Sequence, residues 1–362
     1  MRTPICGQRS ASTRPKPQPR VEEESQAMDG TLRVPPDGLP KMSLRSKILQ
    51  GIGYLVGLVI LGWCVQVAFV QGDWSRVREA DPMLVAGIVL ASIASILLNG
   101  ILFRLTLEPV RPRVSAAGAP RVPPLPGTAA LIGVNWVCTL ANFAPLRLGM
   151  IARITYHMRV DRLRFMEIVP WFALDLVTFL LPIAGIIGAT LFVRSFGLGW
   201  IGLTAALITI LSLLLWRGSK LRLVPARLRE TARIIGDGRS LLICLPIRCL
   251  DLACNGLRTI LAAQILGLDL DFAESFALAS AGLVASLGPL GRLGFREAGF
   301  ALFAQLLSAK GFEGGIDAAF IQLSMLDSAG EAIAALLGGI PLSIWMTRRI
   351  LAPDPTTRTA RR

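Results

Sequence analysis

The stretch Leu287-Gly-Pro-Leu-Gly-Arg-Leu-Gly-Phe-Arg-Glu297 interrupts an apolar segment with glycines, a proline, two arginines and a glutamate. Its apolar flanks, residues 275–286 and 298–307, are each shorter than the about 20 residues that a membrane-spanning helix needs. Its charges would each cost about 2.5–3.5 kcal/mol at the centre of a bilayer if they faced lipid. Interrupted backbone at that depth is tolerated where protein or a wet cavity surrounds it. The stretch therefore predicts the tip of a re-entrant hairpin that forms half of a functional site.

The composition indicates a membrane protein. Hydrophobic residues make up 53% of the 362-residue chain and charged residues 17%, and apolar runs recur from residue 48 to residue 346. We therefore predict an all-α, polytopic integral membrane protein with one transmembrane domain over residues 42–349. Residues 1–41, rich in Arg, Pro, Ser and Glu, are expected to form a disordered N-terminal tail. Residues 350–362 are expected to form a basic cytoplasmic tail.

The formal net charge of +14 does not indicate a nucleic-acid partner, because the basic residues lie beside apolar segments and the sequence contains no nucleic-acid recognition module. Anionic headgroups of the cytoplasmic leaflet are the expected partner of these charges. The six cysteines include no C-x-x-C pair, and the single histidine, His157, cannot build a multi-histidine site. We therefore expect no metal and no cofactor. His157 and Asp161 are predicted to lie on a solvated interfacial face.

Six full spans are predicted, at residues 48–70, 83–103, 167–193, 200–216, 241–266 and 318–346. The distribution of positive charge decides how the other apolar segments cross. If residues 128–149 and 275–307 both enter the membrane and return to the same side, most of the 38 lysines and arginines face the cytoplasm. We therefore predict a multi-pass protein of the cell (inner) membrane with two re-entrant broken helices and both termini cytoplasmic. The acidic loops at residues 269–274 and 313–317 are then external.

A short stretch of internal sequence similarity supports this topology. Ala144-Pro-Leu-Arg-Leu-Gly149 is similar to Gly288-Pro-Leu-Gly-Arg-Leu-Gly294. One motif would enter from the cytoplasm and the other from outside, and opposed broken helices around a site at the membrane midplane are a common plan of transporters. The sequence therefore predicts an inverted repeat whose two broken segments approach each other.

With both motifs considered, residues 45–348 resemble the transmembrane domain of lysylphosphatidylglycerol synthase and its flippase-like relatives. Asn142-Phe-Ala-Pro-Leu-Arg-Leu-Gly-Met-Ile-Ala-Arg153 is similar to the family's Asn–Pro–Arg–Gly–acidic–Arg motif. Asp175 resembles the family's aspartate in the following helix, and Gly291-Arg-Leu-Gly-Phe-Arg-Glu-Ala298 resembles its glycine-rich Arg–Glu motif.

The sequence departs from the family's pattern at two positions. Met150 stands where the family usually has an acidic residue, and Arg292 stands where it usually has glycine. Both departures alter the charge at the expected site, so the substrate can differ from that of other members. In bifunctional members a cytosolic aminoacyl-transferase domain follows this region. Few residues follow the last predicted helix here, so the resemblance implies a stand-alone flippase-like protein.

Polar residues recur at membrane depth on three predicted helices. Cys244, Arg248, Asp251, Asn255 and Arg258 are spaced as one helical face. The residues predicted to bind a lipid headgroup are Asn142, Arg147, Gly149, Arg153, Asp175, Arg248, Asp251, Arg258, Gly288, Arg292, Gly294, Arg296, Glu297, Asp327 and Glu331. The arginines suit bidentate contact with phosphate. A closed ion-pair network that only holds the helices together remains the alternative.

These features predict a lipid transporter that moves a phosphate-bearing or polar-headgroup lipid, in particular an anionic one, between leaflets. The alternatives are an intramembrane lipid-modifying enzyme, or an accessory subunit of a separate enzyme system for aminoacyl or glycosyl transfer. The sequence has no Ser/His/Asp set, no metal-ligand cluster and no nucleotide-binding loop. We therefore expect that the chain is not an enzyme.

Overall fold

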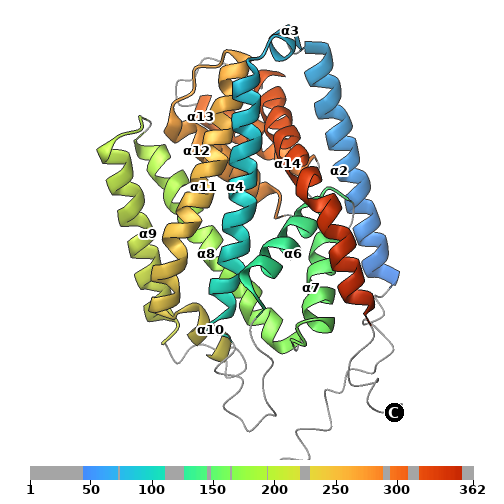
Figure 1. Cartoon of the computed structure of the whole chain (residues 1–362). Coiled ribbons are helices and arrows are strands. Elements are labelled where there is room, and N and C mark those ends of the chain that lie inside the picture. Colours follow the sequence, from blue (N-terminus) through green and yellow to red (C-terminus); the bar gives the residue numbers. More distant parts are fainter. Residues whose placement is uncertain are drawn as a thin grey trace, which may run out of the picture. The chain divides into compact units, whose positions relative to one another are not determined.

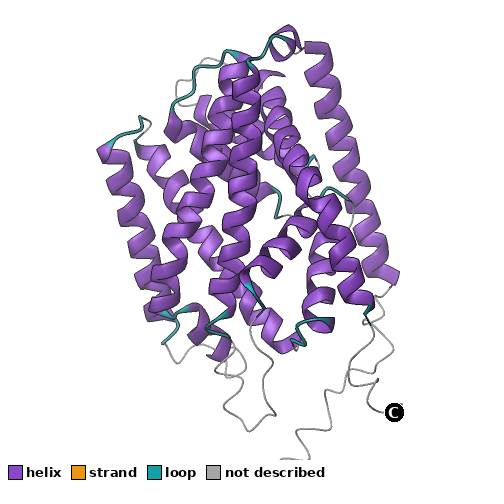
Figure 2. Ribbon diagram, viewed as in Figure 1, coloured by secondary structure: helices purple, strands orange, loops and turns teal. Residues whose placement is uncertain are grey.

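The computed structural model describes residues 44–71, 74–110, 126–144, 148–163, 165–193, 195–220, 229–287, 294–308 and 318–352. Within these residues the regular structure is helical throughout (Figure 2). The chain divides into two units, Met1–Lys47 and Ile48–Arg362, and the account that follows concerns the second. Besides the helices introduced below, two short helices are present, α3 (Trp74–Arg78) and α10 (Arg229–Ile235).

Five helices are long and apolar enough to cross a membrane, which confirms the all-α polytopic class and five of the six predicted spans. They are α4 (Pro82–Leu107), α8 (Phe165–Phe192), α9 (Leu198–Gly218), α11 (Gly238–Leu266) and α14 (Ala318–Leu351). The sixth predicted span lies in α2 (Leu44–Gln71), whose 28 residues correspond to a length of about 42 Å. Within α2, the residues Leu58–Val70 form an apolar helix that is too short to count as a membrane span by the same criteria.

Two pairs of shorter helices lie at the predicted broken segments, and the first pair extends beyond the predicted residues 128–149 to Arg159. The first hairpin consists of α6 (Thr128–Ala141) and α7 (Leu148–Arg159), and the second of α12 (Phe272–Ala285) and α13 (Phe295–Ser308). A helix of 14 residues is about 21 Å long and cannot cross a bilayer core of about 30 Å. The hairpin tips at residues 145–147 and 288–293 lie outside the described residues.

The second hairpin packs at the end of the molecule where α4 begins, in the upper half of Figure 1, together with the start of α14. The first hairpin packs at the opposite end, against the C-terminal part of α14 around Met346. The two hairpins therefore occupy opposite halves of the bundle.

The helices form two sets of the same order and opposite direction. The first set is α2, α4, the first hairpin and α8, and the second is α9, α11, the second hairpin and α14. The central helices α4 and α11 are antiparallel, because Arg76, just before α4, donates to the Leu266 carbonyl at the end of α11 at 2.6 Å. The last helix of each set packs against helices of the other set. Helix α8 packs on α9 and α12, and α14 packs on α2 and α6. This arrangement is an inverted repeat.

Two glycines occupy corresponding places in the repeat. A Cβ at Gly100 of α4 would overlap Ile132 of α6, and a Cβ at Gly256 of α11 would overlap the ring of Phe276 of α12. Close approach of helices through small residues is a main source of packing energy in membranes, where lipid is as apolar as the protein core. Each central helix therefore approaches the hairpin of its own set closely at one glycine.

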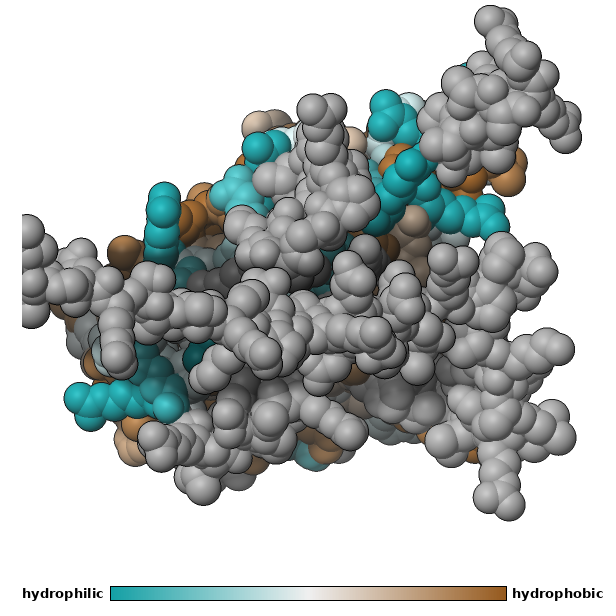
Figure 3. Space-filling model, turned by 90° about the horizontal axis from the view of Figure 1, so that it is seen from below, coloured by the Kyte–Doolittle hydropathy of each residue, from teal (hydrophilic) through white to brown (hydrophobic). Residues whose placement is uncertain are grey.

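The two ends of the bundle differ in charge. The end formed by the C-termini of α7, α9 and α14, seen in Figure 3, exposes hydrophilic side chains around its described part. Exposed basic residues at this end include Arg159, Arg162, Arg217, Lys220, Arg233, Arg239, Arg348 and Arg349, beside the exposed acid Glu108. The opposite end, at α3 and the start of α12, exposes Glu79, Asp81, Asp269 and Asp271 beside Arg76 and Arg78.

Candidate functional site

Of the fifteen predicted site residues, seven belong to ion-pair clusters on or beside α11, and three cannot be placed. Arg147, Gly288 and Arg292 lie outside the described residues. Those that lie on or against α11 are Asp175, Arg248, Asp251, Arg258, Arg296, Asp327 and Glu331. Asn142, Gly149 and Arg153 belong to the first hairpin, and Gly294 and Glu297 to the start of α13.

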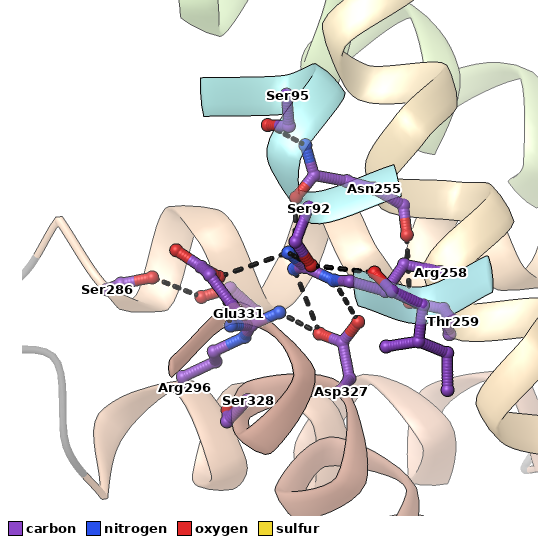
Figure 4. Close-up of polar contacts among 12 residues, drawn as sticks. Ser92, Ser95, Asn255, Arg258, Thr259, Ser286, Arg296, Asp327, Ser328 and Glu331 are labelled. Atoms are coloured by element: carbon purple, nitrogen blue, oxygen red, sulfur yellow. Dashed lines mark hydrogen bonds and ion pairs between the residues drawn. The ribbon is translucent and has the colours of Figure 1, made fainter. Parts of the chain in front are cut away.

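Four charged side chains from three helices form what we call the charge square: Arg258 of α11, Arg296 of α13, and Asp327 and Glu331 of α14 (Figure 4). Asp327 pairs with both arginines. Glu331 also pairs with both, at 3.2 Å to Arg258 and 3.0 Å to Arg296. The two carboxylates lie four residues apart, one helical turn, so both face the same side of α14.

The charge square is balanced and almost completely buried. The side chains of Arg258 and Arg296 are each 1% exposed and that of Asp327 is 0% exposed. An isolated charge is very costly at this depth, so each guanidinium compensates the two carboxylates between which it lies. Arg258 also donates to Ser92 of α4 at 3.3 Å and to Asn255 at 3.1 Å.

A second cluster surrounds Arg248, which precedes Arg258 in α11 and lies nearer the N-terminus of that helix. Arg248 donates to Asp175 of α8 at 2.7 Å, to Asp251 at 3.0 Å and to the side-chain Oδ1 of Asn99 of α4 at 2.6 Å. Asp251 in turn accepts from Ser95 at 2.6 Å and from the Asn99 amide at 2.8 Å. Asp175 is the accessible end of this cluster, with a side chain that is 19% exposed.

The two clusters are related by the inverted repeat. Ser95 and Asp251, which contact each other, are separated by 156 residues, the same offset that relates Asn99-Gly100 to Asn255-Gly256. Asn99 donates to Asp251, and Asn255 donates to Ser95 at 3.3 Å. Residues that correspond in the repeat therefore touch each other between α4 and α11, so the pseudo-twofold axis passes between Ser95 and Asp251.

Hydrogen bonds connect the clusters into one network. It runs from Asp175 through Arg248, Asp251, Ser95, Asn255 and Arg258 to Asp327, Glu331 and Arg296. One end lies on α8 of the first set of helices and the other on α13 and α14 of the second set. The network thus links the two halves of the repeat through α11.

The second hairpin begins α13 with a turn that depends on glycine. Gly294 has φ 83°, a left-handed conformation that glycine adopts without strain. Its N–H donates to the Glu297 carboxylate at 2.9 Å, and in a capping box the N3 glutamate accepts the N-cap N–H in the same way. Ser328 of α14 donates to the same carboxylate at 3.2 Å. Glu297 therefore fixes the start of α13 against α14.

The first hairpin is held by a comparable close approach. A Cβ at Gly149 would overlap the Cys138 carbonyl oxygen and the Asn142 side chain, so α7 starts in contact with the end of α6. One turn later, Arg153 donates to the side-chain Oδ1 of Asn135 at 2.6 Å, and its guanidinium lies 3.9 Å above the Phe103 ring centroid. Unlike the arginines of the two clusters, Arg153 is held here by an amide and an aromatic ring.

His157 does not lie on a solvated face, so that prediction is wrong. Its side chain is 1% exposed, 2.6 Å from the Asp161 carboxylate and packed edge-on against Trp171. Burial lowers the pKa of His157, although its hydrogen bond to Asp161 opposes that shift. The polar and basic composition of residues 150–165 led to that prediction, but Trp171 of α8 covers His157.

Ser92, Ser95, Asn99 and Asn135 belong to the site but were missed from the sequence. Small polar residues in apolar helices are common, so composition alone gives no reason to select them. The repeated Asn-Gly pair at Asn99 and Asn255 is the signal that indicates them. Among the described residues, no group of three or more His, Cys, Asp or Glu side chains is arranged to hold a metal ion.

A family model described as the lysylphosphatidylglycerol synthase TM region matches residues 51–326. The match includes both hairpins and all of α11. No curated protein and no solved structure matches the chain.

Proposed function

Since the chain belongs to the family of the lysylphosphatidylglycerol synthase transmembrane region, we propose that it is a transporter that moves a lipid with a phosphate-bearing or polar headgroup between the leaflets of the cell membrane. The observation that carries this proposal is the pair of half-length hairpins that enter a multi-pass bundle from opposite ends. Such hairpins bring backbone donors and charged side chains to a depth where a lipid headgroup must pass.

Arg153 is our candidate for direct contact with the headgroup. It follows the break of the first hairpin and is held by the Asn135 amide and the Phe103 ring. A phosphate offers this guanidinium a charged, bidentate partner in place of neutral ones. Arg248, Arg258 and Arg296, in contrast, are already engaged with carboxylates.

The proposed orientation places the basic end of the bundle in the cytoplasm, because positively charged loops are retained there. The first hairpin then enters from the cytoplasm and the second from outside. The proposed partners are membrane lipids, with a separate lipid-modifying enzyme as a further partner. The proposal contains no chemical change of the lipid.

The experiment uses purified protein in vesicles of phosphatidylethanolamine and phosphatidylglycerol that contain headgroup-labelled phosphatidylglycerol. Chemical quenching of the outer leaflet measures movement, and mass spectrometry of the extracted lipid detects modification. We expect movement without modification. Replacement of Arg153 by Gln should slow movement about 10- to 100-fold, since a hydrogen bond to a charged group contributes about 1.5–3 kcal/mol.

Arg159, exposed on the same helix, provides the matched control, and Arg159→Gln should move lipid at the wild-type rate. Lipid that is modified rather than moved would assign an enzyme. Vesicles in which the lipid neither moves nor changes would favour the accessory role instead.

A further inference from the structure

A close approach between α4 and α6 places one buried amide at membrane depth. Gly100 of α4 and Ile132 of α6 lie so near each other that a Cβ on the glycine would overlap the isoleucine. One turn along each helix, the Asn135 amide nitrogen donates to the Ile96 carbonyl at 2.8 Å. Ile96 lies near the middle of α4, and Asn135 is 4% exposed. Such a buried amide needs a hydrogen-bond partner for its oxygen as well.

Arg153 of α7 is that partner, and its chemistry fixes the orientation of the amide. It donates to the Asn135 side-chain Oδ1 at 2.6 Å. A guanidinium only donates hydrogen bonds and a backbone carbonyl only accepts them, so the amide oxygen must face Arg153 and the amide nitrogen must face Ile96. Asn135 therefore ties α4, α6 and α7 together and holds Arg153 in one direction.

The side chains that interact with Arg153 carry no negative charge. They are the Asn135 amide, the Phe103 ring, the Cys138 thiol and, one turn along α7, the His157 imidazole. Among the residues that the structure describes, no carboxylate pairs with Arg153, in contrast to the arginines of the charge square and of the second cluster. Arg153 is also only partly buried, so a ligand can reach its side chain.

A guanidinium at this depth that lacks a carboxylate leaves its counterion to the ligand. Phosphatidylglycerol carries one net negative charge and balances Arg153. Phosphatidylethanolamine brings an ammonium together with its phosphate, so one positive charge stays uncompensated, which is costly at membrane depth. An acidic side chain in place of the Asn135 amide would supply the counterion from the protein and exclude the lipid phosphate.

We propose that Asn135 determines the charge selectivity of the first hairpin: its neutral amide positions Arg153 and leaves the guanidinium to be neutralised by a headgroup of net negative charge. This inference rests on the proposed transport function and adds the class of lipid that is moved. Asn135 acts through Arg153, so it is a positioning residue rather than a group that binds the lipid itself.

The experiment compares two lipids in vesicles of phosphatidylethanolamine and phosphatidylglycerol. Either lipid is labelled on an acyl chain, which leaves its headgroup charge unchanged, and chemical quenching of the outer leaflet measures its movement. The wild type should move phosphatidylglycerol at least about tenfold faster than phosphatidylethanolamine. Asn135→Asp should remove that preference, because the new carboxylate pairs with Arg153.

Two further variants test whether the charge beside Arg153 is the cause. Cys138→Asp brings a carboxylate to another contact of Arg153 while the Asn135 amide stays in place, and it should lose the preference in the same way. Gln264→Glu makes the same amide-to-carboxylate change at an exposed position at the end of α11, and it should keep the preference of the wild type.

Thermal unfolding in detergent separates a positioning role from a purely structural one. If Asn135→Asp lowers Tm but the folded protein keeps the preference for phosphatidylglycerol, Asn135 only holds the helices together and the inference is overturned. Equal movement of both lipids by the wild type would overturn the selectivity and leave the transport function intact. Vesicles in which neither lipid moves would contradict the transport function itself, and the inference with it.

Discussion

Each buried arginine of the network is defined by its carboxylate partners. Arg248 lies between Asp175 and Asp251, and Arg258 and Arg296 share Asp327. Burying an ion pair brings little net stability, but removal of one partner leaves an uncompensated charge. The closed ion-pair reading and the headgroup reading are therefore compatible, because a network that is satisfied at rest can exchange one partner for a ligand.

The charge square predicts a non-additive effect of mutations. Arg296→Gln alone should destabilise the protein by about 3–5 kcal/mol at pH 8, because it removes a guanidinium that pairs with both Asp327 and Glu331. The double variant R296Q/E331Q should regain most of that loss, since it removes one of these carboxylates together with the guanidinium. Thermal unfolding in detergent measures both. If the two substitutions destabilise additively, the square is not a coupled unit.

The hairpins depend on positions that have no room for a side chain. Gly149 lies against Cys138 and Asn142, so the α6–α7 angle is set by backbone contact. Gly100 and Gly256 likewise allow each central helix to approach its hairpin closely, at Ile132 and at the Phe276 ring. A helix of this length buries little surface by itself, so these contacts decide where its polar residues lie.

Gly149→Ala should therefore destabilise the first hairpin. The added Cβ meets backbone and a short side chain that cannot move aside, and overpacking of this kind costs about 1–3 kcal/mol. The control is Gly202→Ala in α9, where a Cβ meets nothing within 4 Å and helix propensity favours alanine by about 1 kcal/mol. Tm should fall in the first variant and stay or rise in the second, whereas equal behaviour of the two would argue against the hairpin contact.

The whole molecule combines an inverted repeat with a charge difference between its ends. The basic end carries aromatic anchors, with Lys220 3.4 Å above the Trp216 ring and Arg349 5.0 Å from the Trp345 ring centroid. Tryptophan paired with basic residues is typical of the membrane–water interface. We therefore expect these side chains to lie where the bundle leaves the membrane on its basic side.

Single-cysteine labelling tests the proposed orientation. In a variant whose native cysteines are replaced by alanine, a cysteine substituted for Asp269 should react with an impermeant maleimide added to intact cells. A cysteine substituted for Lys220 should react only after permeabilisation, because the proposed orientation places the basic end in the cytoplasm. The reverse pattern would invert the orientation and the assigned entry sides of both hairpins.

The sequence by itself determined the class and the helices, because length, apolarity and the position of Pro, Gly and charge are local properties. It placed five confirmed spans, both broken segments, and the polar face of α11 from Arg248 to Arg258. Only the tertiary structure decided which charged side chains pair with each other. Arg296 pairs with Asp327 and Glu331, Glu297 caps its own helix, and His157 is buried under Trp171. The contacts of Arg296 and His157 join different helices, and they depend on the packing angles that glycines such as Gly149 and Gly256 permit.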